Sequence, residues 1–207
     1  MKIRTLASLS AVGICAFGAG LLVNPTIAEE PPDPAAMEAA WNDYMTPGPE
    51  HAHMAEHLVG QWEVSSKWWM DPNAPPQESS MVSTIKSVMD GRYIIEHMDG
   101  ELDMGDGQIK EWQGMGVFGY DNMTDNYVSV WCDSWMTGLL MAEGEASEDG
   151  RTITYRGKSP DPMSGRYKPN KFVITMISPN RHRFEMYDKS PSGEWWKNME
   201  MMYTRAR

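Results

Sequence analysis

From Gln61 onward, apolar and polar side chains alternate with a period of two, which predicts β-strands. Short clusters of turn-forming residues such as Asp-Gly and Ser-Gly separate the segments, which indicates an antiparallel meander. The predicted strands are Gln61–Met70, Ser79–Met89, Arg92–Asp99, Ile109–Tyr120, Tyr127–Ser134, Gly138–Ala146, Thr152–Lys158, Lys171–Ser178, Arg183–Asp188 and Trp195–Arg205. A flat sheet of this size would leave exposed edges, so it closes into a barrel or folds into two layers. We expect a mainly β fold, a single antiparallel up-and-down β-barrel of about ten strands.

Two short stretches before the first strand have helical spacing instead. Trp41 and Tyr44 lie on one face of a predicted helix over Ala35–Met45. A second helix is predicted over Glu50–Val59, with Gly60 as its stop. One or two short N-terminal helices therefore precede the barrel.

The first 28 residues have the features of a targeting segment. Lys2 and Arg4 give a positive start, Leu6 to Val23 is mostly apolar, and small residues follow near Ala28. A Sec-type signal peptide is predicted over residues 1–28, with a retained membrane anchor as the alternative. The expected divisions are 1–28 signal peptide, 29–46 linker and short helix, and 47–207 β-barrel domain. The expected location is periplasmic or secreted, in a bacterium.

Loss of that segment would leave a strongly acidic chain with one cysteine. It removes two basic residues and no acidic ones, so 16 Lys and Arg remain against 29 Asp and Glu, a net charge of -13. Such a surface repels phosphate backbones, which argues against nucleic acid as a partner. Only Cys132 would remain, so an intramolecular disulfide is excluded and the fold must rely on its core.

Several strands carry carboxylates and aromatic residues on the same face as apolar ones. Glu96 alternates with its neighbours in step with Ile94 and Met98, and Trp131 and Asp133 share a face with Ser129. Glu185 and Tyr187 share another face, and Glu200 is in step with Trp196, Asn198 and Met202. A mixed interior is typical of a ligand cavity. The predicted ligand-binding residues are Glu96, Trp131, Asp133, Glu185, Tyr187 and Glu200. In the alternative, Glu96 and Glu200 face solvent.

Other candidate chemistry is weaker. The segment from His53 to His57 has the spacing of an inverted zinc-protease motif, but it is short and precedes a β-meander, so we expect a polar helix flank. Cys132 follows Val128 and Val130 on an apolar face, where a buried, inert thiol is expected. Gly114 lies inside a strand, which indicates a bend or a close backbone approach. No catalytic residue, metal site or cofactor is assigned.

An ordered series of short motifs spans most of the chain. They are Pro47-Gly48-Pro49-Glu50-His51, Gly60-Gln61-Trp62, Met70-Asp71-Pro72, Asp90-Gly91-Arg92, Phe118-Gly119-Tyr120-Asp121-Asn122, Asp133-Ser134, Thr137-Gly138, Pro160-Asp161-Pro162, Glu185-Met186-Tyr187-Asp188 and Tyr203-Thr204-Arg205. In this order they resemble DUF1579, a bacterial family of unknown function. The resemblance implies an exported protein with one lipocalin-like β-barrel and no established activity. A Gly-x-Trp at the barrel entry and a basic residue at its exit also resemble small ligand-carrying barrels.

Three hypotheses follow for function. In the first, an exported barrel, monomeric or homodimeric, binds a small, largely apolar molecule. The second is an enzyme of hydrolase or isomerase type that uses inward-facing carboxylates. The third is an envelope protein, structural or partner-binding, whose N-terminal helices dock a partner. An exposed apolar patch near Trp41 and Tyr44 would favour the third.

Overall fold

The chain forms a closed barrel of ten strands preceded by two helices. The structure, a computed structural model, describes residues 33–103, 108–190 and 192–207, so the expected signal peptide lies outside the described residues. The elements are α1 (Pro34–Met45), α2 (Pro49–Leu58), β1 (Gly60–Trp68), β2 (Gln77–Val88), β3 (Tyr93–Asp103), β4 (Ile109–Asp121), β5 (Asn126–Asp133), β6 (Leu140–Ala146), β7 (Thr152–Asp161), β8 (Arg166–Ser178), β9 (Arg181–Lys189) and β10 (Trp195–Arg205).

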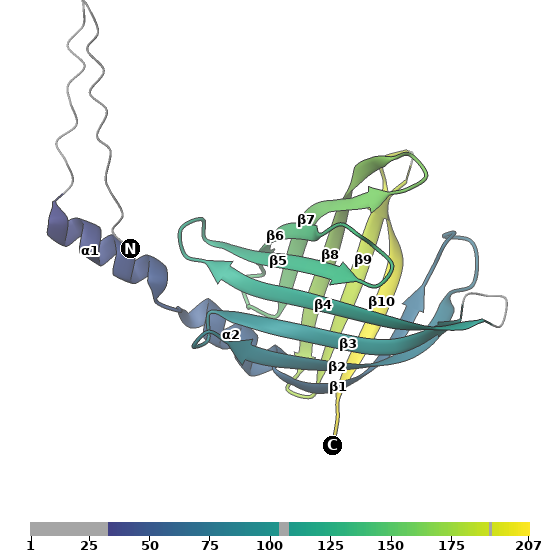
Figure 1. Ribbon diagram of the computed structural model, residues 1–207, viewed down its shortest axis with the longest axis horizontal. Helices are drawn as coiled ribbons and strands as arrows, with labels where there is room; N and C mark the ends of the chain where they lie inside the picture. Colours follow the sequence, from purple (N-terminus) through teal and green to yellow (C-terminus); the bar gives the residue numbers. More distant parts are fainter. Residues whose placement is uncertain (1–32, 104–107, 191) are drawn as a thin grey trace, which may run out of the picture.

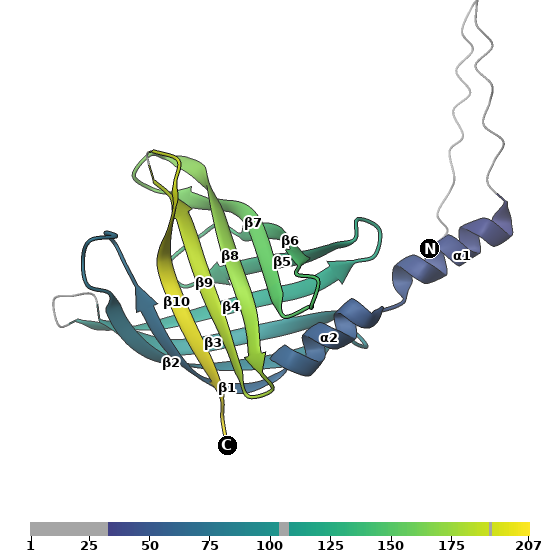
Figure 2. The ribbon, with the colours of Figure 1, turned by 180° about the vertical axis from the view of Figure 1, so that it is seen from behind.

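Each strand pairs antiparallel with the next in sequence, and β10 returns to pair with β1 (Figure 1). The opposite view shows β8, β9 and β10 side by side across the barrel wall (Figure 2). Closure leaves the described sheet without an edge strand, which is how such a sheet avoids pairing with other chains. The predicted up-and-down barrel with its short N-terminal helices is confirmed.

The hairpin of β7 and β8 is longer than predicted. The predicted strands were Thr152–Lys158 and Lys171–Ser178, which leave out Pro160 and Pro169. In the structure Pro160 pairs with Tyr167, and the hairpin runs on to Asp161. The Asp161 carboxylate accepts hydrogen bonds from the backbone N–H of Met163 and the hydroxyl of Ser164, which stabilises the tight turn there.

Helix α2 packs against one part of the barrel and contributes to its core. It lies against β2, β3 and β4, with Met54 and Leu58 buried. Pro49 occupies the first turn, where its missing N–H costs nothing, and the N–H of Gly48 donates to Nδ1 of His51 over 3.1 Å. These contacts fix the helix immediately before β1 begins.

The two ends of the barrel sequence meet at Trp62 and Arg205, which are partners in the β1–β10 register. The Arg205 guanidinium lies 4.2 Å from the centre of the Trp62 ring and donates to the carbonyl of Val59 over 2.9 Å. The buried indole of Trp62 in turn donates to the carbonyl of Leu58. Gly60 allows this approach, because a Cβ there would lie 2.2 Å from Arg205 Nη1. The Gly-x-Trp and the terminal Arg thus close this end of the barrel together.

Helix α1 lies away from the barrel wall and none of its residues is buried (Figure 1). Hydrogen bonds nevertheless attach its C-terminal end to the barrel. The side-chain amide of Asn122 donates to the carbonyls of Asp43 and Thr46, and Arg92 donates to the carbonyl of Met45 over 2.7 Å. Within the described ranges, no helix has the length and apolar character needed to cross a membrane.

Candidate ligand-binding site

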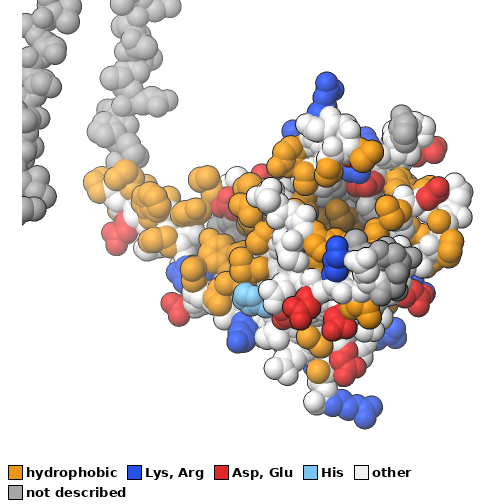
Figure 3. Space-filling model, turned by 45° about the vertical axis from the view of Figure 1, so that its right-hand side comes forward, with side chains coloured by type: hydrophobic (Ala, Val, Ile, Leu, Met, Phe, Trp, Pro, Cys, Tyr) orange, Lys and Arg blue, Asp and Glu red, His pale blue; other side chains and the backbone are white. Residues whose placement is uncertain are grey.

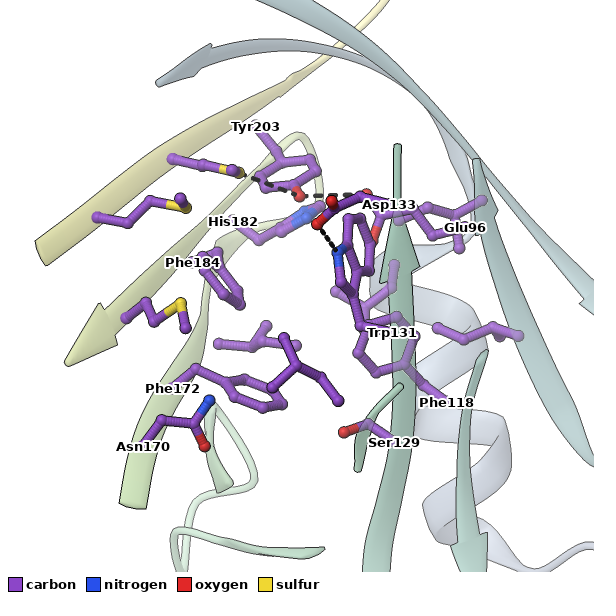
Figure 4. Close-up of a pocket in the computed structure, with 18 of the residues that line it drawn as sticks. Glu96, Phe118, Ser129, Trp131, Asp133, Asn170, Phe172, His182, Phe184 and Tyr203 are labelled. Atoms are coloured by element: carbon purple, nitrogen blue, oxygen red, sulfur yellow. Dashed lines mark hydrogen bonds between the residues drawn. The ribbon is translucent and has the colours of Figure 1, made fainter. Parts of the chain in front are cut away.

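A cavity of about 210 Å³ lies inside the barrel, and its wall is mostly apolar. Aromatic side chains from β4, β5, β8 and β9 form much of it, as the close-up shows (Figure 4). The apolar lining residues are Leu58, Ile85, Ile94, Trp112, Phe118, Trp131, Met136, Leu140, Phe172, Ile174, Phe184, Met186, Met199 and Met201. The space-filling view shows hydrophobic side chains around a hollow in the molecule (Figure 3). Apolar pockets with a few polar groups are the usual form of small-molecule sites.

Glu96 is the most deeply buried carboxylate of the cavity wall. Its side chain on β3 is 5% exposed, which excludes the alternative that it faces solvent. The hydroxyls of Ser83 and Tyr203 both donate to its Oε1, over 2.7 and 3.1 Å. Burial raises the pKa of Glu96 above its ordinary value, although these two hydrogen bonds oppose the shift. Burial, the larger effect, therefore favours the neutral carboxylic acid.

His182 lies beside this cluster and is held neutral. Its ring stacks on Tyr203 at 4.1 Å and meets the edge of Trp62 at 4.4 Å. Burial, and secondarily the charge of Arg205, lower its pKa to about 3. Nδ1 of His182 is buried without a hydrogen-bond partner in the described part of the chain. The imidazole is thus an uncharged polar group in the cavity wall.

Trp131 and Asp133 lie at the end of β5, and both line the cavity. The indole of Trp131 donates to Oδ2 of Asp133 over 3.1 Å (Figure 4). The backbone N–H of Trp135 donates to Oδ1 of the same carboxylate over 2.9 Å. Asp133 therefore fixes the orientation of the indole. Gly114 on the neighbouring strand makes room for it, because a Cβ there would lie 2.4 Å from Trp131 Cζ2.

The other three predicted ligand-binding residues do not line this cavity. On β9, the inward positions are those of His182, Phe184 and Met186, so Glu185 and Tyr187 face the opposite side of the strand. On β10, Met199 and Met201 line the cavity, and Glu200 between them faces outward. The structure thus separates the six predicted residues into an inner and an outer set.

The outer set belongs to an ion-pair cluster on the outer face of β9 and β10, in which the neighbouring side chains leave Glu185 only 8% exposed. Lys197 pairs with Glu200 and lies 3.1 Å from Oε1 of Glu185, whose Oε2 is 3.2 Å from Arg183. The Lys171 ammonium lies 4.1 Å from the Tyr187 ring centre. These side chains satisfy one another outside the barrel. The hydrolase or isomerase hypothesis therefore retains only Glu96 and Asp133 of the carboxylates considered for it.

The histidines of α2 have structural contacts. Nε2 of His53 is 2.9 Å from the carbonyl of Gly150, and Nδ1 of His57 is 2.9 Å from the carbonyl of His53. His51 is buried against Tyr120. Among residues 33–103, 108–190 and 192–207, no group of three or more His, Cys, Asp and Glu residues is arranged to hold a metal ion.

Comparison with known sequences places this barrel in a family. The sequence profile of DUF1579, a family described as proteins of unknown function, matches residues 46–205. The chain belongs to the DUF1579 family. No curated protein sequence matches the chain. The match covers both α2 and the complete barrel, so the predicted family is confirmed.

A solved structure shares the overall fold of this DUF1579 protein, and two others are similar at lower TM-scores. The S-type phycobiliprotein lyase CPES from Guillardia theta is similar at 14% identity, covering 78% of this chain and 99% of that chain, with a TM-score of 0.52. A redesigned β-barrel is 15% identical over 75% of this chain and 96% of its own, with a TM-score of 0.39. A structure of EF1p2_mFAP2b bound to DFHBI is 13% identical over 75% and 99%, with a TM-score of 0.38.

The sequence did not single out three polar residues in the cavity of the DUF1579 barrel. Tyr203 had only its place in the final Tyr-Thr-Arg motif as a signal, and Asn170 and His182 lie one residue before the predicted strands that begin at Lys171 and Arg183. The prediction for Cys132 was wrong. The mixed face of β5 points inward, so Cys132 faces outward and is only half-buried, with Sγ 3.8 Å from the carbonyl of Met115.

Proposed function

We propose that this DUF1579 protein binds a small, largely apolar molecule inside its barrel. The supporting observation is a cavity walled by aromatic and aliphatic side chains that also holds buried polar groups, among them Glu96 and His182. Its volume of about 210 Å³ is below the roughly 300–1,000 Å³ of drug-sized sites. A molecule with two or three rings suits this space.

The ligand should be uncharged or at least not anionic. The residues that line the cavity, all within the described ranges, include no Lys or Arg. Asp133 contributes a carboxylate, and burial favours the neutral forms of Glu96 and His182. An anion would lose its hydration in the cavity without gaining a cationic partner, which is costly. Free fatty acids and other carboxylates are therefore poor ligands for this barrel.

Two fluorescent probes of nearly identical shape test this proposal. N-phenyl-naphthylamine is neutral, and anilinonaphthalene sulfonate carries one negative charge on a similar skeleton. We expect the neutral probe to bind at least about tenfold more tightly, which corresponds to about 1.4 kcal/mol. Equal binding of both probes, or tighter binding of the sulfonate, contradicts a cavity selective for neutral molecules.

A pair of variants on β10 locates the bound probe. Met199→Trp fills part of the cavity, whereas Met202→Trp adds the same side chain to the outer face of the same strand. Binding of the neutral probe should be lost in the first variant and retained in the second. Binding that survives Met199→Trp in a folded protein would place the site elsewhere and refute the proposal.

Self-association through α1 is a second candidate property. The helix buries none of its side chains and exposes Met37, Trp41, Tyr44 and Met45, with Trp41 60% exposed. A second copy of the chain could cover this face, because the helix has few charges to oppose it. We expect sedimentation equilibrium to show a dimer that dissociates in Trp41→Ser. A wild-type monomer throughout the accessible concentration range would remove this candidate.

We also propose that the chain is exported and that residues 1–28 are then removed by cleavage. The positive start, the apolar run and the small residues before Glu29 support this. Intact mass spectrometry of protein from the periplasm should give a chain that begins at Glu29. A protein that begins at Met1, or that is retained in the cytoplasm, would contradict the proposal.

A further inference from the structure

One oxygen of the Glu96 carboxyl group accepts hydrogen bonds from described residues, and the other does not. Both of its hydrogen bonds from neighbouring hydroxyls go to Oε1, and Oε2 has no hydrogen-bond partner in the described part of the chain. Ser83 and Tyr203 act as donors, so they occupy acceptor sites of the neutral acid and leave its own O–H to Oε2. Since Glu96 lines the cavity, this O–H is available to an acceptor inside it.

Asn170 on β8 is a second polar side chain without a partner. It is 2% exposed, and its carboxamide makes no hydrogen bond to another described residue; Oδ1 is buried and unsatisfied. Buried polar side chains almost always have a partner, and each exception needs an explanation. Asn170 lines the same cavity as Glu96 (Figure 4). A bound molecule that pairs with the carboxamide would account for it.

The two groups lie on opposite walls of the barrel. In the closed strand order, β8 is five strands from β3 in either direction. Phe118 and Trp131 on one side, and Phe172 and Phe184 on the other, line the space that they share (Figure 4). The cavity therefore presents one polar group at each of two facing walls, with an apolar, largely aromatic region between them.

We propose that the ligand is a neutral molecule with a hydrogen-bond acceptor such as a ketone for Glu96 and, on the opposite side of an apolar ring system, a hydroxyl for Asn170. This inference rests on the proposed binding function. The acid O–H donates to the carbonyl oxygen. The hydroxyl can both donate and accept, so it pairs with either atom of the carboxamide. The chemical class is a small hydroxylated ring ketone or a compound of the same polarity.

Three probes that differ only in these groups test the proposal: tetralin, tetralone, and a hydroxytetralone with its hydroxyl on the far ring. Each competes with N-phenyl-naphthylamine for the wild-type protein. We expect the ketone to improve affinity about tenfold over the hydrocarbon, and the hydroxyl to add a similar factor, as hydrogen bonds to otherwise unpartnered buried groups should.

Matched variants assign each gain to its residue. In Glu96→Leu, tetralone should bind no more tightly than tetralin. Glu96→Gln keeps an N–H donor at this position, so it should retain the tighter binding of tetralone. In Asn170→Leu the advantage of the hydroxyl should disappear and that of the ketone should remain. Glu96→Gln also covers the case in which Glu96→Leu fails to fold.

The outcomes separate this inference from the proposed function. If tetralin competes as well as tetralone and hydroxytetralone, the barrel binds apolar molecules but the inferred polarity of the ligand is wrong. The same conclusion follows if the ketone gain persists in a folded Glu96→Leu or is absent from Glu96→Gln. If neither the fluorescent probe nor any of the three compounds binds in the cavity, the proposed function fails as well.

Discussion

The hydroxyl of Tyr203 donates a hydrogen bond to Oε1 of Glu96 over 3.1 Å and thereby joins β10 to β3 across the barrel interior. Both side chains are buried, and their strands, β10 and β3, are not neighbours in the sheet. Another buried tyrosine, Tyr155, has a hydroxyl without a hydrogen-bond partner among the described residues. Of these two buried phenols, the hydroxyl of Tyr203 is satisfied and that of Tyr155 is not.

Substitution of these two tyrosines by phenylalanine should change stability in opposite directions. Tyr203→Phe removes the hydrogen bond to Glu96 and should lower the free energy of unfolding by about 1–2 kcal/mol. Tyr155→Phe keeps the ring stacked on Phe172 and removes an unsatisfied hydroxyl, so it should be neutral or stabilising by up to about 1 kcal/mol. Urea unfolding at one pH measures both. A larger loss in Tyr155→Phe than in Tyr203→Phe would contradict the assigned partners.

Glu96 should make the barrel less stable as the pH rises. Its pKa is raised in the folded state by burial, so the folded state holds the proton more tightly than the unfolded chain. The resulting stabilisation is complete below the ordinary pKa of 4.5 and is lost as the pH rises through the folded-state pKa. Glu96→Gln lacks this titration. Between pH 4.5 and the folded-state pKa, its free energy of unfolding should therefore rise relative to that of the wild type by up to about 1.4 kcal/mol per pH unit.

Urea unfolding at pH values from about 4 to 8 measures this difference. Glu63→Gln on the exposed face of β1 controls for the loss of a surface carboxylate. A constant difference between Glu96→Gln and the wild type at all pH values would show that Glu96 is not buried as described.

His182 should have the opposite effect and make the barrel less stable as the pH falls. Its pKa falls from 6.5 to about 3 on folding, so the stabilisation it gives is present above 6.5 and is lost as the pH falls toward 3. At pH about 4.5 the wild type should have lost about 2–3 kcal/mol relative to His182→Phe, which keeps a ring between Trp62 and Tyr203. His97 is exposed, so His97→Asn should follow the wild type. Parallel pH profiles for all three proteins would overturn this assignment.

Loss of the Arg205 side chain should open the end of the barrel. Arg205→Leu removes a cation–π contact and hydrogen bonds to the carbonyls of Val59 and Pro179, so unfolding should become easier by about 2–4 kcal/mol. The stability of Arg205→Lys should lie between those of the wild type and Arg205→Leu, because lysine keeps the charge but lacks the planar guanidinium group. The exposed Arg207 provides the control, because Arg207→Leu should change stability little. Similar melting temperatures for both leucine variants would contradict a closing role for Arg205.

The fold was predictable because the alternation of side chains is regular and the turns are chemically distinct. Ten segments were placed correctly, and Trp62 and Arg205 indicated where the barrel closes. The predicted strands of the β7–β8 hairpin were shorter than those of the structure and left out Pro160 and Pro169. Composition alone did not reveal that a tight turn near Asp161 allows pairing beyond them.

The inner face of each strand was harder to predict, because alternation defines two faces without saying which one points inward. On β5 the mixed face with Trp131 is internal and the apolar face with Cys132 is external. On β10 a register shift between Lys197 and Met199 changes the face on which later residues lie, so Lys197 and Glu200 are outside while Met199 is inside. A bulge of this kind leaves no clear sign in the sequence.

Leu58 contributes both to the cavity wall and to the closed end of the barrel. Its side chain lines the cavity, and its carbonyl accepts the hydrogen bond of the Trp62 indole beneath the Arg205 guanidinium. Any molecule that fills the cavity therefore packs against the residue on which the barrel seal is built. A ligand that binds there should therefore stabilise the closed end of the barrel as well as the cavity wall.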